Sequence, residues 1–148
     1  MTLDVRPVGA QDKPQWAQLW YAYLDFYDTS LPLAVYDATF AALLSDDPHA
    51  PCGYLAWHGG QAVGLVHYLF HSHCWHPEGV CYLQDLFTTP ESRGMGAGRA
   101  LISAVYAAAD ARGAGSVYWL TQDFNATARK LYDKIGEETP FIKYKRPE

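Results

Sequence analysis

Residues 84–99 read QDLFTTPESRGMGAGR, and residues 100–112 continue as ALISAVYAAADAR. The first stretch begins with β character, and the second is an alanine-rich amphipathic segment that predicts a helix. The turn between them carries three glycines bracketed by two arginines: Arg93, Gly94, Gly96, Gly98 and Arg99. Glycines allow a ligand to approach the backbone closely, and the first turn of a helix offers unpaired N–H groups. This order predicts a site for a phosphate or pyrophosphate.

Two common phosphate-binding loops do not fit this turn. A P-loop ends in Gly-Lys-Ser/Thr, whereas Gly98 is followed by an arginine and an alanine. The dinucleotide fingerprint G-x-G-x-x-G also fails, because the sixth residue from Gly94 is Arg99 and the sixth from Gly96 is Leu101. The pattern that remains is R-x-x-G-x-G.

That pattern, met by Arg93, Gly96 and Gly98, resembles the pyrophosphate loop of the GNAT superfamily of acetyl-CoA-dependent N-acetyltransferases. A second segment, NATARKLY at residues 125–132, resembles the helix that lies beside the coenzyme in that family. The resemblance covers essentially the whole chain. It implies an α/β (α+β) fold in one domain over residues 1–148, with a mixed, mostly antiparallel central sheet and helices on both faces.

Hydrophobic periodicity and turn residues give the same order of elements, β-α-α-β-β-β-α-β-α-β. We expect a hairpin turn at Gly59-Gly60 and a polar, aromatic-rich connection over residues 71–79. The expected strands are 3–7, 53–58, 62–71, 80–88, 116–121 and 139–145. Four helices are expected: one that opens at residues 11–14, one over 36–44, one directly after the glycine turn and one over 125–135.

Composition limits the classes of function. The 148 residues are 49% hydrophobic, which is ample for one core, and the formal charge of −5 argues against a nucleic-acid partner. We expect a cytoplasmic protein without a membrane partner, because no long apolar run and no signal-peptide pattern is present. The three cysteines, Cys52, Cys74 and Cys81, are expected to be reduced.

The resemblance implies a role for many residues. Backbone around Leu86, Phe87 and Thr88 would hold the pantetheine arm of acetyl-CoA, with the Leu86 N–H facing the developing oxyanion. Tyr132 would donate to the leaving sulfur. The remaining coenzyme-binding residues implied are Arg93, Gly94, Met95, Gly96, Ala97, Gly98, Arg99, Asn125 and Ala128.

Residues 82–87, YLQDLF, look like the diamine and polyamine acetyltransferase branch, where Tyr-Leu-Glu-Asp usually precedes an aromatic. Gln84 stands in place of that glutamate, and an amide cannot act as a general base. The proton acceptor is then Asp85, a histidine or water; the candidate histidines are His67, His71 and His73.

Three residues at the end of the first helix match the region that lines the amine site in that branch, and with Gln84 they are the expected substrate-binding residues: Asp25, Tyr27 and Asp28. An ordinary solvated helix end is the alternative for these three. Another cluster could suggest zinc: His71, His73, Cys74 and His76. It lacks a second ligand pair at recognised spacing, so we expect no metal.

The expected function is transfer of an acetyl group from acetyl-CoA to a primary amine of a small molecule, such as a polyamine, a diamine or an amino-acid-like compound. Two alternatives stay open: a protein or peptide acetyltransferase acting on lysine or the N-terminus, and a non-catalytic acyl-CoA-binding module. A homodimer is compatible with the exposed apolar content expected near residues 141–144.

Overall fold

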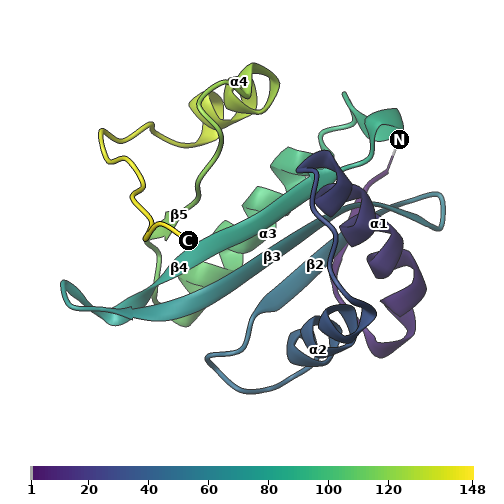
Figure 1. Cartoon of the computed structure of the whole chain (residues 1–148), viewed down its shortest axis with the longest axis horizontal. Helices are drawn as coiled ribbons and strands as arrows, with labels where there is room; N and C mark the ends of the chain where they lie inside the picture. The colour runs from purple at the N-terminus through teal and green to yellow at the C-terminus, as the bar shows by residue number, and fades with distance from the viewer. Residues whose placement is uncertain (1) are drawn as a thin grey trace.

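Segments rich in apolar residues in the middle of the chain form the long strands of a five-stranded sheet in order β1-β2-β3-β4-β5, and β3 is buried along most of its length. The computed structural model describes residues 2–148. Figure 1 shows its elements in chain order: β1 (Asp4–Pro7), η1 (Ala10–Asp12), α1 (Lys13–Phe26), α2 (Leu33–Leu43), β2 (Cys52–His58), β3 (Gln61–His73), β4 (His76–Thr88), η2 (Pro90–Ser92), α3 (Ala97–Arg112), β5 (Val117–Tyr118) and α4 (Ala126–Ile135). The predicted fold class is confirmed: the sheet is mixed and mostly antiparallel, with helices on both faces.

Two hairpins join the three central strands, one between β2 and β3 and one between β3 and β4. Gly59 and Gly60 both have positive φ, which confirms the predicted turn between β2 and β3. The predicted connection over residues 71–79 is shorter than expected, because β3 continues to His73 and β4 begins at His76. His71 and His73 pair with Val80 and His76 across the two strands, and the tip of the hairpin carries Trp75, which is 82% exposed.

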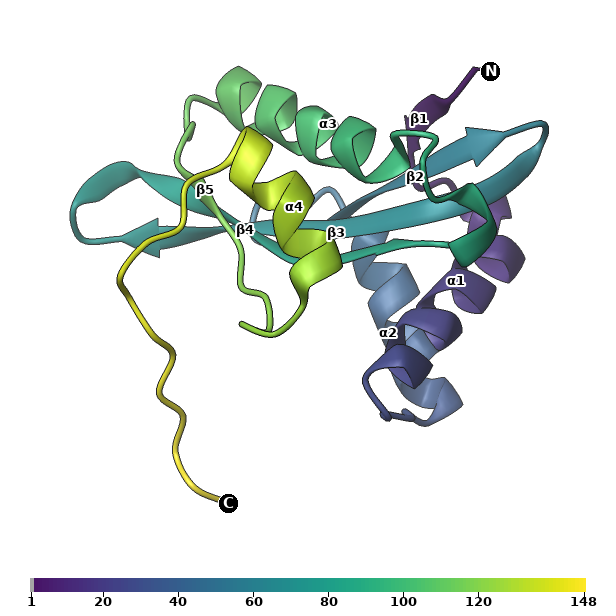
Figure 2. The same cartoon turned by 90° about the horizontal axis from the view of Figure 1, so that it is seen from above.

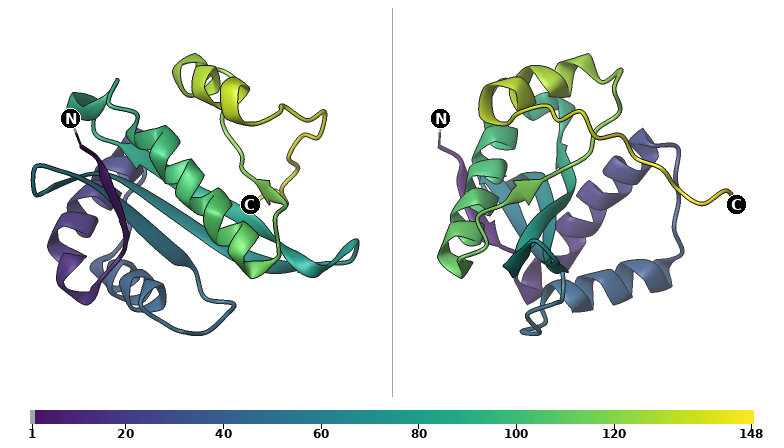
Figure 3. Two further views of the ribbon diagram at one scale, coloured as in Figure 1. Left: turned by 180° about the vertical axis from the view of Figure 1, so that it is seen from behind. Right: turned by 90° about the vertical axis from the view of Figure 1, so that its left-hand side faces the viewer.

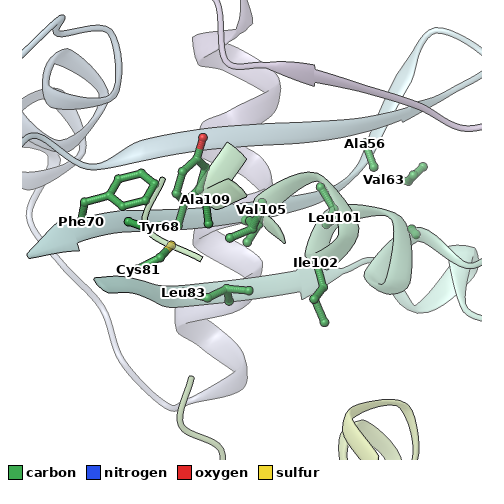
Figure 4. Packing of buried hydrophobic residues seen from close by; sticks show 13 residues of the cluster. Ala56, Val63, Tyr68, Phe70, Cys81, Leu83, Leu101, Ile102, Val105 and Ala109 are labelled. Carbon is green, nitrogen blue, oxygen red and sulfur yellow. The ribbon is translucent and has the colours of Figure 1, made fainter. Parts of the chain in front are cut away.

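Helices cover the two faces of the sheet unequally. In Figure 2 and Figure 3, α3 lies along one face and α1 and α2 lie on the other. Figure 4 shows the α3 side chains Leu101, Ile102 and Val105 pointing at the sheet. All three are 0–1% exposed, and burial of each contributes about 1.5–3 kcal/mol to folding.

The parallel pair β4–β5 is short, and this opens the sheet. Only Cys81 and Tyr82 of β4 pair with β5, through Val117 and Tyr118. Beyond them the chain leaves β4 toward α4, so that β5 and α4 diverge from the rest of β4 (Figure 1). The predicted strand over 116–121 is therefore only two residues long.

The predicted last strand, residues 139–145, is wrong: within residues 2–148 no strand follows α4. Its apolar side chains Phe141, Ile142 and Tyr144 are 85%, 76% and 87% exposed. An isolated strand has no partner for its backbone groups, and the short β5 offers little edge for pairing. The segment instead runs away from the body of the protein (Figure 2).

Within the described residues, no helix is sufficiently long and apolar to cross a membrane.

Candidate active site

A β-bulge at Gln84 sets the geometry of the last part of β4. In the β3–β4 register, Leu83 pairs with Tyr68 and Asp85 pairs with His67, which leaves Gln84 without a partner. An extra residue shifts the alternation of both backbone groups and side chains by one position. The backbone groups and side chains of β4 after Gln84 therefore point to the opposite side from the one they would have in a regular strand.

Two backbone hydrogen bonds confirm this shift. The Cys81 N–H donates to Ser116 O on the β5 side (2.8 Å), whereas the Thr89 N–H donates to Val63 O on the β3 side (2.9 Å). In a regular strand these groups, an even number of residues apart, would face the same side. Counting back from Thr89, the N–H groups of Thr88 and Leu86 face the side from which β5 has diverged.

The same count places the third expected arm-binding residue differently. The N–H of Phe87 faces β3, and its carbonyl oxygen lies 3.1 Å from the position of a Cβ added to Gly64 of that strand. Of the three arm-binding residues implied by the resemblance, Leu86 and Thr88 thus offer N–H groups toward the opening, and Phe87 does not.

The bulge also turns Asp85 toward α1. Leu83 and Leu86 pack in the cluster on the α3 face, whereas Phe87 packs in the cluster under α1 and α2. Asp85 shares the face of Phe87, and its carboxylate accepts from the buried His67 on β3. Without the bulge, this carboxylate would face α3.

A chain of buried hydrogen bonds ends at that carboxylate. The indole N–H of Trp16 donates to Nε2 of His67 (2.9 Å), and Nδ1 of His67 lies 2.8 Å from Oδ2 of Asp85. The side chains of His67 and Asp85 are only 4% and 13% exposed. Sequence periodicity places Trp16 on the buried face of α1 but cannot show that its N–H meets a histidine of β3, because that contact depends on the tertiary packing.

Three phenols surround Asp85. Burial first, and the neighbouring Asp85 carboxylate second, raise the pKa of Tyr23 well above its usual range. The same two causes, in the same order, raise the pKa of Tyr27 and of Tyr82. The structure thereby places Tyr27, an expected substrate-binding residue, near Asp85.

A pocket of about 290 Å³ opens beside Gln84 and Asp85. Because the bulge places both residues on the α1–α2 side, both side chains line it, together with His67 and Trp20. On the α2 side the lining consists of three small side chains, Ala38, Thr39 and Ala42, and of Leu43. Asp25 and Asp28 are exposed at the end of α1 and are not among the described lining residues.

The glycine turn has the conformation that its residues suggested. Gly94 and Gly96 have φ of 87° and 83°, and a Cβ at either position would meet nothing within 4 Å. Gly96 is the N-cap of α3, and because it has no side chain, it gives no cap hydrogen bond to the first N–H groups of the helix. The flanking Arg93 and Arg99 are both exposed.

Other contacts fix this turn on the sheet. The buried Ser92 hydroxyl donates to Thr89 O (2.9 Å), and Gly98 approaches Leu131 of α4 so closely that an added Cβ would lie 3.3 Å from Cδ2 of that residue. Met95 and Ala97 complete the turn, with Ala97 buried. These observations fit a group that carries phosphate, because the turn is anchored while its glycines and helix end stay open.

Helix α4 brings Tyr132 to the opposite side of the opening. Asn125 caps the helix, accepting from the N–H of Ala128 through its side-chain oxygen at 3.4 Å. Tyr132 packs edge-on against Trp119, and burial, followed by the nearby Tyr27, raises its pKa to about 12. Tyr27 and Tyr132, far apart in sequence, are therefore neighbours across the end of β4.

The remaining histidines are engaged elsewhere. His71 Nε2 lies 2.8 Å from the Tyr118 hydroxyl, and His73 Nδ1 accepts from the Trp75 N–H at the hairpin tip. Of the three candidate histidines, only His67 reaches Asp85. Within residues 2–148, no three His, Cys, Asp or Glu side chains are arranged to hold a metal ion.

Comparison with known proteins decides the family. The model of the acetyltransferase (GNAT) family matches residues 15–136, which is most of the chain. The protein belongs to the GNAT family. It is an acetyl-CoA-dependent acyltransferase, as the named N-acetyltransferases among its relatives also indicate.

Two of these relatives have named substrates. The chain is 39% identical over 145 residues to the D-amino-acid N-acetyltransferase HPA3 of Saccharomyces cerevisiae, covering 96% of this chain and 89% of that protein. It is 30% identical over 105 residues to the thialysine N-epsilon-acetyltransferase of Bos taurus, covering 70% of this chain and 56% of the relative.

Solved structures agree on the fold. The aminoglycoside acetyltransferase AAC(6')-Iy, in complex with a CoA-containing bisubstrate analogue, superposes with a TM-score of 0.85 at 20% identity, covering 100% of this chain and 99% of the other. A ribosomal-protein-alanine N-acetyltransferase from Brucella melitensis gives 0.79 at 20% identity, with 99% and 100% covered. At such identities the likeness concerns the fold alone.

Proposed function

We propose that this GNAT enzyme acetylates the primary amine of a small, amino-acid-like molecule bound in the pocket beside Asp85. The observation that carries the proposal is the bulge at Gln84, which turns the Asp85 carboxylate into the pocket while leaving the Leu86 N–H at the open edge of β4. A carboxylate for the amine and an N–H for the acyl oxygen then lie on consecutive residues.

The pocket favours a small substrate. Its volume of about 290 Å³ and its walls from α1, α2 and β4 suit a compact molecule better than a peptide segment, which needs an open groove. Asp85 is the one acidic residue among the described lining residues, whereas a polyamine carries several positive charges. Relatives that act on D-amino acids and on thialysine support an amino-acid-like substrate.

Trp20 supports the same substrate class. It lines the pocket, is 6% exposed, and its buried indole N–H has no hydrogen-bond partner within residues 2–148. A buried donor without a partner is costly, and a substrate carboxylate would supply an acceptor oxygen. An amino acid offers both the amine and that oxygen.

We propose Asp85 as the proton acceptor. Gln84 has no basic group, and both ring nitrogens of His67 are already in hydrogen bonds. The free amine attacks the thioester carbonyl carbon, the C–N bond forms as the C–S bond breaks, and the nitrogen becomes acidic enough to give its proton to a carboxylate. The Leu86 N–H donates to the carbonyl oxygen as charge develops on it.

Tyr132 would donate a hydrogen bond to the leaving sulfur. With its pKa at about 12, its hydroxyl stays protonated in neutral solution. A thiol has a pKa of about 8.5, so the tyrosine stabilises the thiolate without giving up its proton completely. The proton taken by Asp85 then reaches the thiolate through water, which yields the amide and free CoA.

The glycine turn would hold the pyrophosphate of acetyl-CoA. Gly94, Gly96 and the first turn of α3 offer open backbone, and Arg93 and Arg99 offer exposed guanidinium groups. Asn125 and Ala128 at the start of α4 would flank the coenzyme from the other side of the opening.

A panel of amines tests this function. Release of CoA thiol is measured with D- and L-amino acids, with their decarboxylated amines as matched controls, and with diamines and lysine peptides. We expect higher kcat/KM for an amino acid than for its decarboxylated amine. Faster turnover of lysine peptides would identify a protein acetyltransferase, and preference for diamines would contradict the role given to Trp20.

A further inference from the structure

The buried hydrogen bonds that link Trp16, His67 and Asp85 determine which ring nitrogen of His67 carries the proton. An indole N–H only donates, so Nε2 of His67 must accept and carries no proton. Nδ1 then carries the proton of the neutral ring and donates it to Oδ2 of Asp85. An imidazolium is disfavoured, because its Nε2–H would face the indole N–H.

Burial makes this arrangement rigid. Trp16 is fully buried and stacks on Trp20, with ring centroids 5.1 Å apart, while Phe40 packs against it from α2. His67 is 3% exposed and sits on the central strand β3. The last member of the chain, Asp85, is more accessible and lines the pocket.

We propose that Trp16 and His67 are positioning residues, which lock the His67 ring as its Nδ1–H tautomer and thereby hold the Asp85 carboxylate toward the amine. Oδ2 is engaged by His67, so the second oxygen of Asp85 is directed to the substrate. Tyr23, whose hydroxyl lies near the same carboxylate, limits its rotation from the α1 side. This inference rests on the proposed function of Asp85 and adds the residues that orient it.

Two variants of His67 whose side chains differ by one methylene group can show whether His67 orients Asp85 or only fills space. In His67→Asn the amide nitrogen lies near the place of Nδ1 and still donates to Asp85, whereas in His67→Gln the amide lies near the place of Nε2, next to Trp16. We expect His67→Asn to keep kcat/KM for the amine within about threefold and His67→Gln to lose at least about tenfold, with the KM for acetyl-CoA unchanged in both. Equal losses, or the reverse order, would overturn the positioning role.

A spectrum of the folded enzyme tests the tautomer without any substrate. Nitrogen-15 NMR of the histidine side chains should show one ring that carries its proton on Nδ1 and none on Nε2. Trp16→Phe should allow the Nε2–H tautomer, whereas Trp20→Phe, on the stacked neighbour, should not. A wild-type ring protonated at Nε2, or at both nitrogens, would refute the proposal.

The two tests also separate this inference from the function on which it rests. The expected tautomer together with full activity of His67→Gln would exclude positioning while leaving Asp85 as the acceptor. Full activity of an Asp85 variant would instead remove the acceptor role itself, whatever the His67 spectrum shows.

Discussion

At the scale of single residues, Gln84 and Asp85 stand where the branch that this segment resembles usually has a glutamate and an aspartate. The glutamine occupies the extra position of the bulge, and the aspartate accepts from His67 inside the protein. An amide at the bulge can bind a substrate but cannot take its proton. Asp85 is then the one acidic side chain among the described lining residues, which is why we propose a less cationic substrate than a polyamine.

The role proposed for Tyr132 can be tested by a single substitution. Tyr132→Phe removes the hydroxyl that we propose donates to the leaving sulfur but keeps the ring that packs against Trp119. We expect unchanged affinity for acetyl-CoA and turnover slower by at least about tenfold, roughly 1.4 kcal/mol of barrier. Steady-state kinetics and titration with CoA measure both quantities. Turnover equal to that of the wild type would exclude Tyr132 from the mechanism.

Sequence alone predicts these residues unevenly. Tyr132 and the glycines follow from short motifs, because they lie on one continuous stretch of chain. The choice among His67, His71 and His73 could not be made, because it depends on which strand pairs with which, and in what register. Trp16 and Trp20 were visible only as apolar positions of a helix.

At the scale of elements, the bulge in β4 and the glycine turn before α3 create the two halves of the site. A bulge has no reliable signal in a single sequence, since residues 80–88 alternate plausibly in either register. The turn is easier, because glycines with positive φ are the residues that such a conformation requires. The structure therefore confirms the predicted turn and adds the bulge.

The two glycines that bound α3 make a matched pair for testing the coenzyme site. Gly96 and Gly113 have φ of 83° and 78°, and an added Cβ meets nothing within 4 Å at either position. Gly96→Ala and Gly113→Ala should each destabilise the protein by about 1–2 kcal/mol through backbone strain. Only Gly96→Ala should also weaken CoA binding, as measured by calorimetry. Equal CoA affinities for the two variants would place the pyrophosphate away from this turn.

At the scale of the whole molecule, divergence of β5 from β4 opens the sheet between the coenzyme turn and α4 (Figure 1). The absence of the predicted last strand also has its cause at this scale. The pattern of residues 139–145 is a local signal, whereas a strand needs a neighbouring strand to pair with, and none follows α4 within the described residues. The expected homodimer stays a prediction, which sedimentation velocity can test.

Alkaline pH should destabilise the fold as a whole. Burial raises the pKa of Cys81 to about 11 and that of Tyr132 to about 12, and it also raises the pKa of Tyr23 and of Tyr68. The folded chain keeps these groups neutral where the unfolded chain ionises them. Stability should hold below about pH 9 and fall as pH rises toward about 11–12, through the folded pKa values. Urea midpoints across this range measure the effect, and a constant midpoint would contradict it.

The central claim, that Asp85 accepts the proton of the amine, is tested most directly by kcat/KM for the amine in Asp85→Asn. The matched control is Glu78→Gln, which makes the same change of charge at an exposed position near the start of β4. We expect Asp85→Asn to lose about 10²–10⁴-fold while still binding acetyl-CoA, and Glu78→Gln to behave as the wild type. If Asp85→Asn retained the wild-type kcat/KM, the proton would leave by another route and Asp85 would not be its acceptor.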